Sequence, residues 1–421
     1  MRNEAQAVPA AVTNRFSRIF LPFAAGYFLS YLFRNVNAVI ASELETDVGM
    51  SADQLGLLTG FYFLAFACFQ LPLGVLLDRF GPRRVESLLL LIAGAGSLTF
   101  AAGQELATLS VGRALIGVGV SACLMASFKT FSQWFEPHRL PLVNGYMLAC
   151  GGLGAMSATA PVEAILGVTT WRVLFVGLAM ACVVVAAVLW WVVPEKTNMT
   201  KAEPLRRQVA ALFHILRSSV FWRFAPAAMV FSGAPMAIQG LWAGPWLRDV
   251  AELDRNAVAQ HLLLLALATT VGFVAWGTLA ERLGRLGIKP IKVAGAGLVL
   301  FLLSVMVLTW QPTGNVLPVW LMFGLCGTSG TLLYTVISTQ FEVALLGRVI
   351  TAFNLMVFLG AFSLQWGIGL VIGFWDAGPG VGYFATGYQV CFGLVVCLQG
   401  LALIWLLWPR DSSVSRRRPD Y

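Results

Sequence analysis

The sequence predicts an all-α, polytopic membrane protein whose twelve transmembrane helices form two pseudo-symmetric six-helix bundles. Composition is the first reason: of 421 residues, 58% are hydrophobic and only 11% are charged. A soluble domain is about half apolar and a quarter charged, so a soluble enzyme, a disordered chain and a disulfide-stapled secreted protein are excluded. The second reason is a series of apolar runs about 20 residues long, the length that a membrane-crossing helix needs. The third is an internal repeat.

The apolar runs fall into two groups of six on either side of a polar stretch. The first group covers residues 18–40, 53–77, 86–104, 108–131, 141–166 and 170–193. The second group covers residues 222–247, 258–280, 291–309, 316–339, 349–374 and 384–408. The first run is too long for the apolar region of a signal peptide, so we expect it to be retained as a helix. We therefore predict an N-terminal bundle over 1–193, a cytoplasmic linker over 194–220, and a C-terminal bundle over 221–421 that ends in a short basic tail.

The distribution of basic residues predicts the orientation in the membrane. Of the 28 lysine and arginine residues, 22 fall in the termini, the central stretch and the loops on one side, and only Arg172, Arg248 and Arg255 fall on the other side. Loops rich in lysine and arginine remain in the cytoplasm. We therefore expect both termini to be cytoplasmic in a bacterial inner membrane. This arrangement accounts for the net charge of +8 without a nucleic-acid partner.

The two halves share a motif at corresponding places. Gly74, Asp78, Arg79 and Gly81 close the second run, and a weaker copy closes the eighth run some 203 residues later. Parallel six-helix repeats are the internal symmetry of one transporter architecture. The first copy, G-x-x-x-D-R-x-G-x-R-R, resembles the signature of the major facilitator superfamily. A second motif, R-x-x-x-G-x-G, begins at Arg113 in the fourth run and resembles another motif of that superfamily.

This resemblance covers about residues 15 to 410 and implies a transporter that works by alternating access. It also implies that the residues of these motifs in both halves form a conformational latch on the cytoplasmic side. An open alternative is that the basic residues serve only as topology signals. The predicted latch residues are Gly74, Asp78, Arg79, Gly81, Arg83, Arg84, Arg113, Gly277, Glu281, Arg282 and Arg285.

The first run carries the strongest candidate for a substrate site. Tyr27, Tyr31 and Arg34 are spaced to share one helix face, which Asn37 continues. Charged residues inside a membrane span are costly, and they are therefore functional candidates by default. A tyrosine-lined face that ends in a fixed cation favours an anionic ligand. The alternative is an arginine that reaches the outer headgroups.

The same stretch is similar to the first helix of the organophosphate:phosphate antiporters, where an arginine at this place helps to hold the substrate phosphate. Lys129 is similar to a basic residue in the fourth helix of those proteins. The chain departs from their pattern in the seventh helix, because no basic residue lies near Met236. A small organic anion with one carboxylate needs only one such partner, so this is the substrate class we predict.

Other polar groups inside the spans complete the predicted site. Gln239 and Trp242 lie in a span interrupted by glycine and proline, which is typical of a helix that bends over a cavity. Tyr334 is a candidate from the second half. Glu163, late in the fifth run, is the candidate for coupling to a proton. We expect a monomer in the lipid bilayer, with no enzymatic activity, no cofactor and no bound metal.

Three alternative functions stay open at this stage. Met229, Met236 and His261 would suit Cu(I), which soft thioether and imidazole groups bind. Efflux of drugs or metabolites is a second alternative, although the fifth helix lacks the Gly-Pro motif of drug:proton antiporters. A membrane sensor with a transporter-like fold is the third.

Overall fold

The computed structural model describes residues 16–194, 210, 213–310, 314–342, 345–375 and 382–408. Within this part of the chain, twelve helices or helix pairs are long and apolar enough to cross a membrane. The predicted fold class, an all-α membrane protein with twelve spans, is thereby confirmed. The predicted tail and most of the predicted linker lie outside the described residues.

The six spans of the first half have the following bounds. The first combines η1 (Phe16–Phe20) with α2 (Leu21–Asn35), and α3 (Asn37–Val48) continues beyond it. The second and third are α4 (Ala52–Phe80) and α5 (Pro82–Ala102). The fourth joins α6 (Leu106–Val120) to α7 (Cys123–Trp134), and the fifth joins α8 (Leu140–Ser157) to α9 (Ala160–Leu166) after the short η2 (Pro137–Arg139). The sixth is α10 (Trp171–Val192).

The second half repeats this order. Its first span joins α12 (Ser219–Ala237), η3 (Ile238–Trp242) and α13 (Ala243–Asp249). Next come α14 (Arg255–Arg285) and α15 (Pro290–Thr309). The tenth span joins α16 (Leu317–Gly327), η4 (Thr328–Thr331) and α17 (Leu332–Ser338). The last two are α18 (Leu346–Ile372), followed by η6 (Gly373–Trp375), and α19 (Ala385–Leu407).

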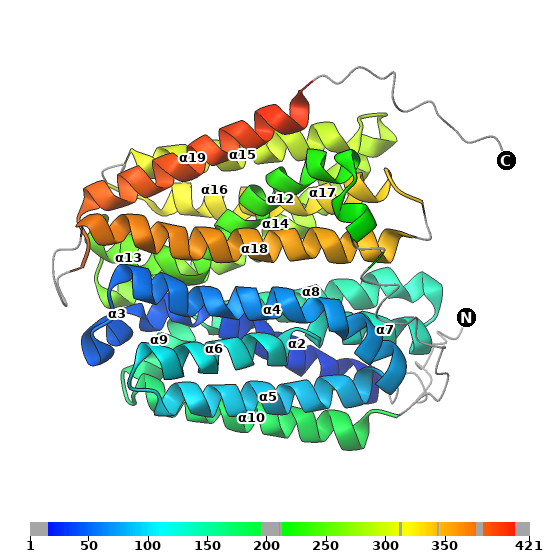
Figure 1. The fold of residues 1–421 in the computed structure, drawn as a ribbon, viewed down its shortest axis with the longest axis horizontal. Helices are drawn as coiled ribbons and strands as arrows, with labels where there is room; N and C mark the ends of the chain where they lie inside the picture. The colour runs from blue at the N-terminus through cyan, green and yellow to red at the C-terminus, as the bar shows by residue number, and fades with distance from the viewer. Residues whose placement is uncertain are drawn as a thin grey trace, which may run out of the picture.

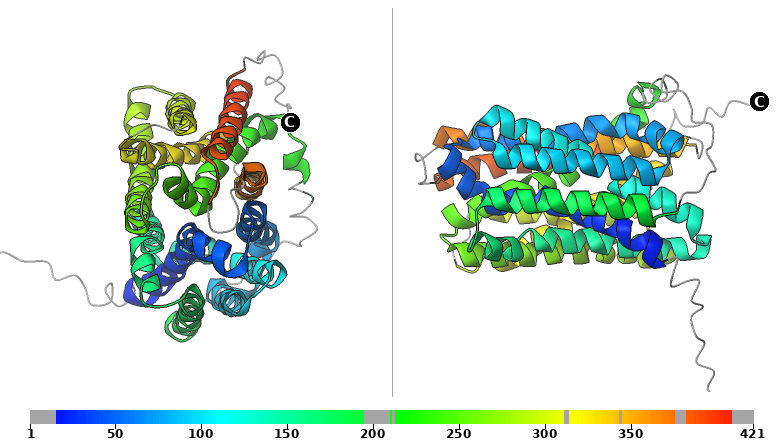
Figure 2. Two further views of the ribbon diagram at one scale, coloured as in Figure 1. Left: turned by 90° about the vertical axis from the view of Figure 1, so that its left-hand side faces the viewer. Right: turned by 90° about the horizontal axis from the view of Figure 1, so that it is seen from below.

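The helices run roughly along one common axis, with the first half on one side and the second half on the other (Figure 1). The end-on view in Figure 2 shows the same two groups of helices facing each other. Contacts between the groups are carried mainly by α4 against α18 and by α8 against α14. The interface therefore joins the second span to the eleventh and the fifth span to the eighth.

The fourth, seventh and tenth spans are interrupted within their length. The fourth breaks at Ser121, the seventh contains the π-helical η3, and the tenth contains the 3₁₀-helical η4. Such breaks free backbone groups, which membrane proteins tolerate where the chain is buried in protein or lines a cavity. The expectation of a bend in the seventh span agrees with η3, which begins three residues after Pro235.

Glycines of the second sequence motif bring α6 close to its neighbours. A Cβ at Gly117 would overlap the backbone of Tyr62 in α4, and one at Gly119 would overlap the backbone of Ala93 in α5. Small residues let membrane helices approach closely without a hydrophobic driving force between them. Gly81 has a different role: at φ +81° it makes the tight turn between α4 and α5.

Candidate functional site

Four of the predicted site residues meet near the centre of the molecule, and we call Tyr27, Tyr31, Arg34 and Tyr334 the Arg34 cluster. The guanidinium carbon of Arg34 lies 4.5 Å from the ring centroid of Tyr31. The rings of Tyr27 and Tyr31 are 4.9 Å apart. Tyr334 comes from the opposite half, and its hydroxyl interacts electrostatically with Tyr31 and Arg34. It also donates a 2.9 Å hydrogen bond to Asn354 Oδ1.

Aromatic rings from both halves close around the same cation. The guanidinium carbon of Arg34 is 5.8 Å from the ring of Phe66 in α4 and 5.5 Å from the ring of Phe358 in α18. These two rings stack with centroids 4.2 Å apart across the interface. A cation over an aromatic face gains a modest electrostatic stabilisation. The cluster therefore lies where the two halves meet.

The charge of Arg34 has no counter-ion in the part of the chain that the structure describes. No carboxylate there lies within ion-pair distance of its guanidinium group, and the buried Nε has no hydrogen-bond partner. Buried charges in proteins are normally paired, because desolvating an unpaired charge costs several kcal/mol. Tyr31, Arg34 and Tyr334 remain partly exposed, so an anion could reach this cation.

A second arginine lies behind the cluster. Arg113 of α6 is 0% exposed, and its Nη1 donates a 3.1 Å hydrogen bond to the carbonyl of Phe33. Its guanidinium carbon is 5.1 Å from the ring of Tyr62, whose hydroxyl also interacts with Arg34. Arg113 thus fixes the chain next to Arg34 and adds positive charge to the same region.

Three further predicted substrate residues are hydrogen-bonded to neighbouring helices. Asn37 is buried in α3 and donates a 2.9 Å hydrogen bond to Thr59 Oγ1 of α4. Gln239, on η3, accepts a 3.1 Å hydrogen bond from Thr269. Trp242 is fully buried and donates to the carbonyl of Gln365 at 3.0 Å. All three are engaged with other parts of the protein in this conformation.

The predicted latch motif forms contacts at the end of the molecule that carries Arg79, Arg83 and Arg84, which we call the basic end. Lys129 Nζ pairs with Asp78 Oδ1 at 2.5 Å, so this lysine lies beside the motif and not beside Arg34. Arg83 donates a 3.0 Å hydrogen bond to the carbonyl of Val193, just beyond the end of α10. The motif therefore links α4 to α7 and α5 to the end of α10 within the first half.

The second copy of the motif is looser. Glu281 pairs with Arg285 at 2.5 Å along one face of α14, and Arg282 lies between them in the sequence. A Cβ at Gly277 would meet no described atom within 4 Å. The second copy therefore makes fewer close contacts than the first in this conformation.

Two arginines join the halves at the opposite end, and we call Glu45, Arg248 and Asp249 the end lock. Arg248 Nη1 pairs with Glu45 Oε2 at 3.0 Å, and its Nε pairs with Asp249 Oδ1 at 2.6 Å. Tyr383 donates to Glu45 at 2.9 Å, and Tyr388 donates to Asp249 at 2.8 Å. Glu45 lies in the first half and the other four residues in the second, so the lock holds this end closed.

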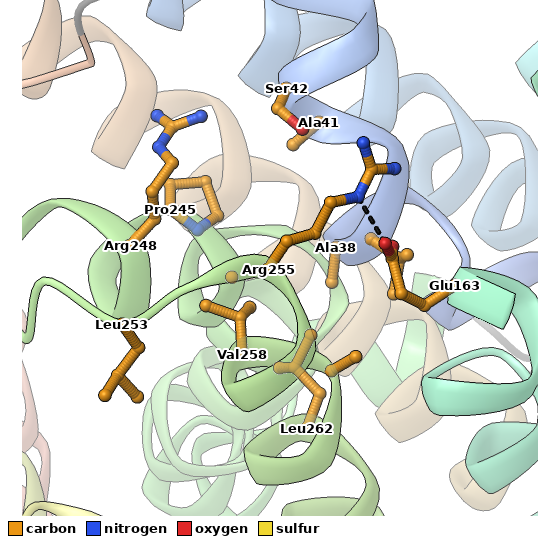
Figure 3. A pocket seen from close by; sticks show the side chains of 13 residues that line it. Ala38, Ala41, Ser42, Glu163, Pro245, Arg248, Leu253, Arg255, Val258 and Leu262 are labelled. Carbon is orange, nitrogen blue, oxygen red and sulfur yellow. Dashed lines mark hydrogen bonds and ion pairs between the residues drawn. The ribbon is translucent and has the colours of Figure 1, made fainter. Parts of the chain in front are cut away.

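The second crossing is made by Arg255 of α14, which pairs with both Glu43 and Glu163 of the first half. Figure 3 shows Arg255 and Glu163 pointing toward one another. Both residues, together with Arg248, line a cavity of about 170 Å³. Burial raises the pKa of the Glu45 carboxyl, and the nearby Arg248 opposes that shift. Glu163, predicted as the coupling acid, is thus an ion-pair partner between the halves in this state.

Sequence reasoning missed a fully buried acid. Glu86 of α5 is 0% exposed, yet it stands only five residues beyond Gly81, at a place where we expected a helix end near the membrane surface. It also missed the end lock, because the sequence separates Glu45 from Arg248 by 203 residues. An acid at the start of an apolar run would have been the only available signal for Glu86.

The residues of the copper alternative are engaged in helix packing. His261 Nδ1 lies 2.8 Å from the carbonyl of Ala257 in its own helix. The backbone of Met229 is in close contact with Gly360 of α18. No group of three histidine, cysteine or acidic side chains suited to a metal ion occurs among the described residues.

A comparison with protein-family models matches residues 23–364 to the Major Facilitator Superfamily. Curated relatives include a fungal "MFS transporter" at 28% identity over 54% of this chain and 50% of the relative. The "probable sulfoacetate transporter" of Cupriavidus necator is 23% identical over 61% of this chain and 63% of the relative. The hexuronate transporter of Bacillus subtilis is 28% identical over 44% of each chain.

The chain thus spans about half to two thirds of the length of the first two of these relatives. Solved structures cover it more completely. The inward-facing bacterial homologue of the human lysosomal transporter Spinster superposes with a TM-score of 0.77 at 17% identity, covering 95% of this chain and 97% of that one. A D-xylose–proton symporter gives a TM-score of 0.70 at 17% identity over 94% and 98%. These likenesses show a shared fold.

Proposed function

The chain belongs to the major facilitator superfamily, and on that premise we propose that it is a secondary transporter that moves a small organic anion by alternating access. The observation that carries this proposal is the cation of Arg34, which has no counter-ion among the described residues and is partly exposed between the halves. A substrate carboxylate would supply the missing negative charge. Planar guanidinium groups bind carboxylates through two parallel hydrogen bonds, which favours this class over neutral sugars.

The neighbouring groups support a hydroxylated or otherwise polar anion. Tyr31 and Tyr334 bring phenol hydroxyls from opposite halves to the same cation. Two relatives are named for a sulfoacetate and a hexuronate substrate, both of which are small organic anions. The charge of Arg113 adds to the positive potential, which would repel a cationic drug.

We further propose two moving units, residues 1–193 and 221–421, joined by a linker over 194–220, with the basic end in the cytoplasm. The ion pairs at the opposite end then keep the periplasmic side closed, so the conformation described is inward-facing. Alternating access requires these pairs to open when the basic end closes. Substrate would then bind at the Arg34 cluster from either side.

Binding and uptake assays test the proposal directly. Purified protein in proteoliposomes is offered D-glucuronate, L-galactonate and sulfoacetate, with D-xylose as the neutral control and Cu(I) and a cationic dye as competitors. We expect at least one of the three anions to raise the melting temperature and to enter the vesicles. Stabilisation by copper or the dye, with no effect of any anion, would contradict the proposal.

Reversing the pair at the basic end tests whether it acts as a latch. Asp78→Lys or Lys129→Asp alone brings two like charges together, and each is expected to slow exchange of a transported anion about fivefold. This magnitude corresponds to the roughly 1 kcal/mol of a partly exposed ion pair. The double reversal keeps the net charge and restores the attraction, so it should recover most of the rate. If both single variants exchange normally, the charges serve topology alone.

A further inference from the structure

Glu86 is a fully buried carboxyl inside the first half. It lies in the second turn of α5, and a Cβ at Gly26 of α2 would overlap its Oε1. Neither carboxylate oxygen has a hydrogen-bond partner among the described residues. Because Gly26 has no side chain, there is room for the Glu86 carboxyl, whose oxygens receive no hydrogen bond from the described residues around it.

The surroundings of Glu86 hold no compensating charge in the described part of the chain. The titratable group next to it is the thiol of Cys123 from α7, and the thiol of Cys182 from α10 lies beyond that. From α2 it faces Gly26, which has no side chain. An ionised carboxylate in such a place would cost many kcal/mol, so the group carries a proton in this conformation.

A line of neighbouring residues connects this acid to the Arg34 cluster. Glu86 lies against Gly26 of α2, the next residue in that helix is Tyr27, and the rings of Tyr27 and Tyr31 are 4.9 Å apart. The ring of Tyr31 in turn lies 4.5 Å from the guanidinium carbon of Arg34. Tyr31 is partly exposed, so water can reach one end of the line while Glu86 closes the other.

We propose that Glu86 is a proton-binding site coupled to occupancy of the Arg34 cluster, which makes the protein an anion–proton symporter. The inference rests on the proposed function. A protonated Glu86 adds no negative charge to the region of Arg34 and therefore strengthens anion binding there, and because such coupling is reciprocal, a bound anion holds the proton on Glu86. In the conformation described, burial keeps the proton on Glu86 even without a bound anion, so on this side the anion leaves before the proton. One proton enters from water with each anion, and both leave on the other side.

Glu86→Gln tests the site, because the amide imitates the protonated acid and cannot release a proton. We expect the variant to keep exchange of labelled D-glucuronate, or of whichever of the three anions is transported, across vesicles without a gradient. Accumulation driven by a pH gradient should fall about tenfold or more, within the range of a typical coupling energy. Glu105→Gln, the same change at an exposed acid, is the matched control. Full gradient-driven accumulation by Glu86→Gln would overturn the proposal.

Infrared difference spectroscopy gives a readout that needs no substrate. Wild-type protein should show the C=O band of a protonated carboxylic acid that is missing from Glu86→Gln and retained in Glu86→Asp. Absence of that band would overturn the proton site even if an anion is transported. By contrast, a wild-type protein that shows the band but carries none of the three anions would count against the proposed function instead.

Discussion

Replacing Arg34 with alanine is expected to weaken binding and uptake of the transported anion by about 10- to 100-fold. A hydrogen bond to a charged group contributes about 1.5–3 kcal/mol, and the variant loses the cation that makes it. Arg34→Lys should give an intermediate loss, because a lysine supplies a point charge without the planar fork of a guanidinium group. Titration calorimetry and initial uptake rates measure both effects.

The same substitution should leave the fold intact. Since the Nε of Arg34 is buried and unpaired, removing the guanidinium group takes away an unfavourable desolvation together with some contacts to Tyr31, Phe66 and Phe358. We therefore expect a melting temperature without ligand that is unchanged or higher. Arg172→Gln serves as the control, because among the described residues this charge contacts the first-half groups Asp47, Gly103 and Trp171. Equal loss of uptake in both variants would contradict a specific role for Arg34.

Much of this architecture could be predicted from the sequence, because a membrane constrains local patterns strongly. A span must be apolar over about 20 residues and must satisfy its own backbone, so its position is visible in composition alone. The proximity of Tyr31 to Arg34 follows from helical periodicity within one span. The meeting of Arg34 with Tyr334 depends on how the two halves dock, which no local pattern encodes.

The partners of charged residues were the hardest part to predict. Lys129 was predicted from its resemblance to a substrate residue, but the fold brings it to Asp78 near the end of α4, a proximity that no local pattern indicates. Glu86 looked like a surface acid because it stands near the start of its helix. Its burial depends on a glycine in another helix, Gly26, and on the neighbouring Cys123. The position of a residue along one helix is therefore a poor measure of its burial when neighbouring helices cover the end of that helix.

Arg248→Ala is expected to open the end of the molecule opposite the basic end. The substitution leaves the carboxylates of Glu45 and Asp249 with 7% and 5% of their side chains exposed and without their cation. Breaking a buried ion pair by removing one partner costs about 3–5 kcal/mol. About 5.5 kcal/mol is needed to change a population that is 99% closed into one that is 99% open, so this loss is a large part of the required free energy. Spin labels at Thr46 and Asn256, exposed positions on α3 and α14, should report a longer distance in the variant.

The raised pKa of Glu45 gives this lock a pH dependence of defined sign. Burial raises that pKa in the closed state, whereas a hydrated Glu45 in the open state returns toward its ordinary value, so the closed state binds the proton more tightly. The resulting stabilisation is present at low pH and is lost as the pH rises through the raised pKa. Acidification should therefore shorten the label distance in the wild type, and Glu45→Gln should remove that response. If the distance between the two spin labels changes neither with pH nor in Arg248→Ala, then Arg255, with Glu43 and Glu163, holds this end closed without the end lock.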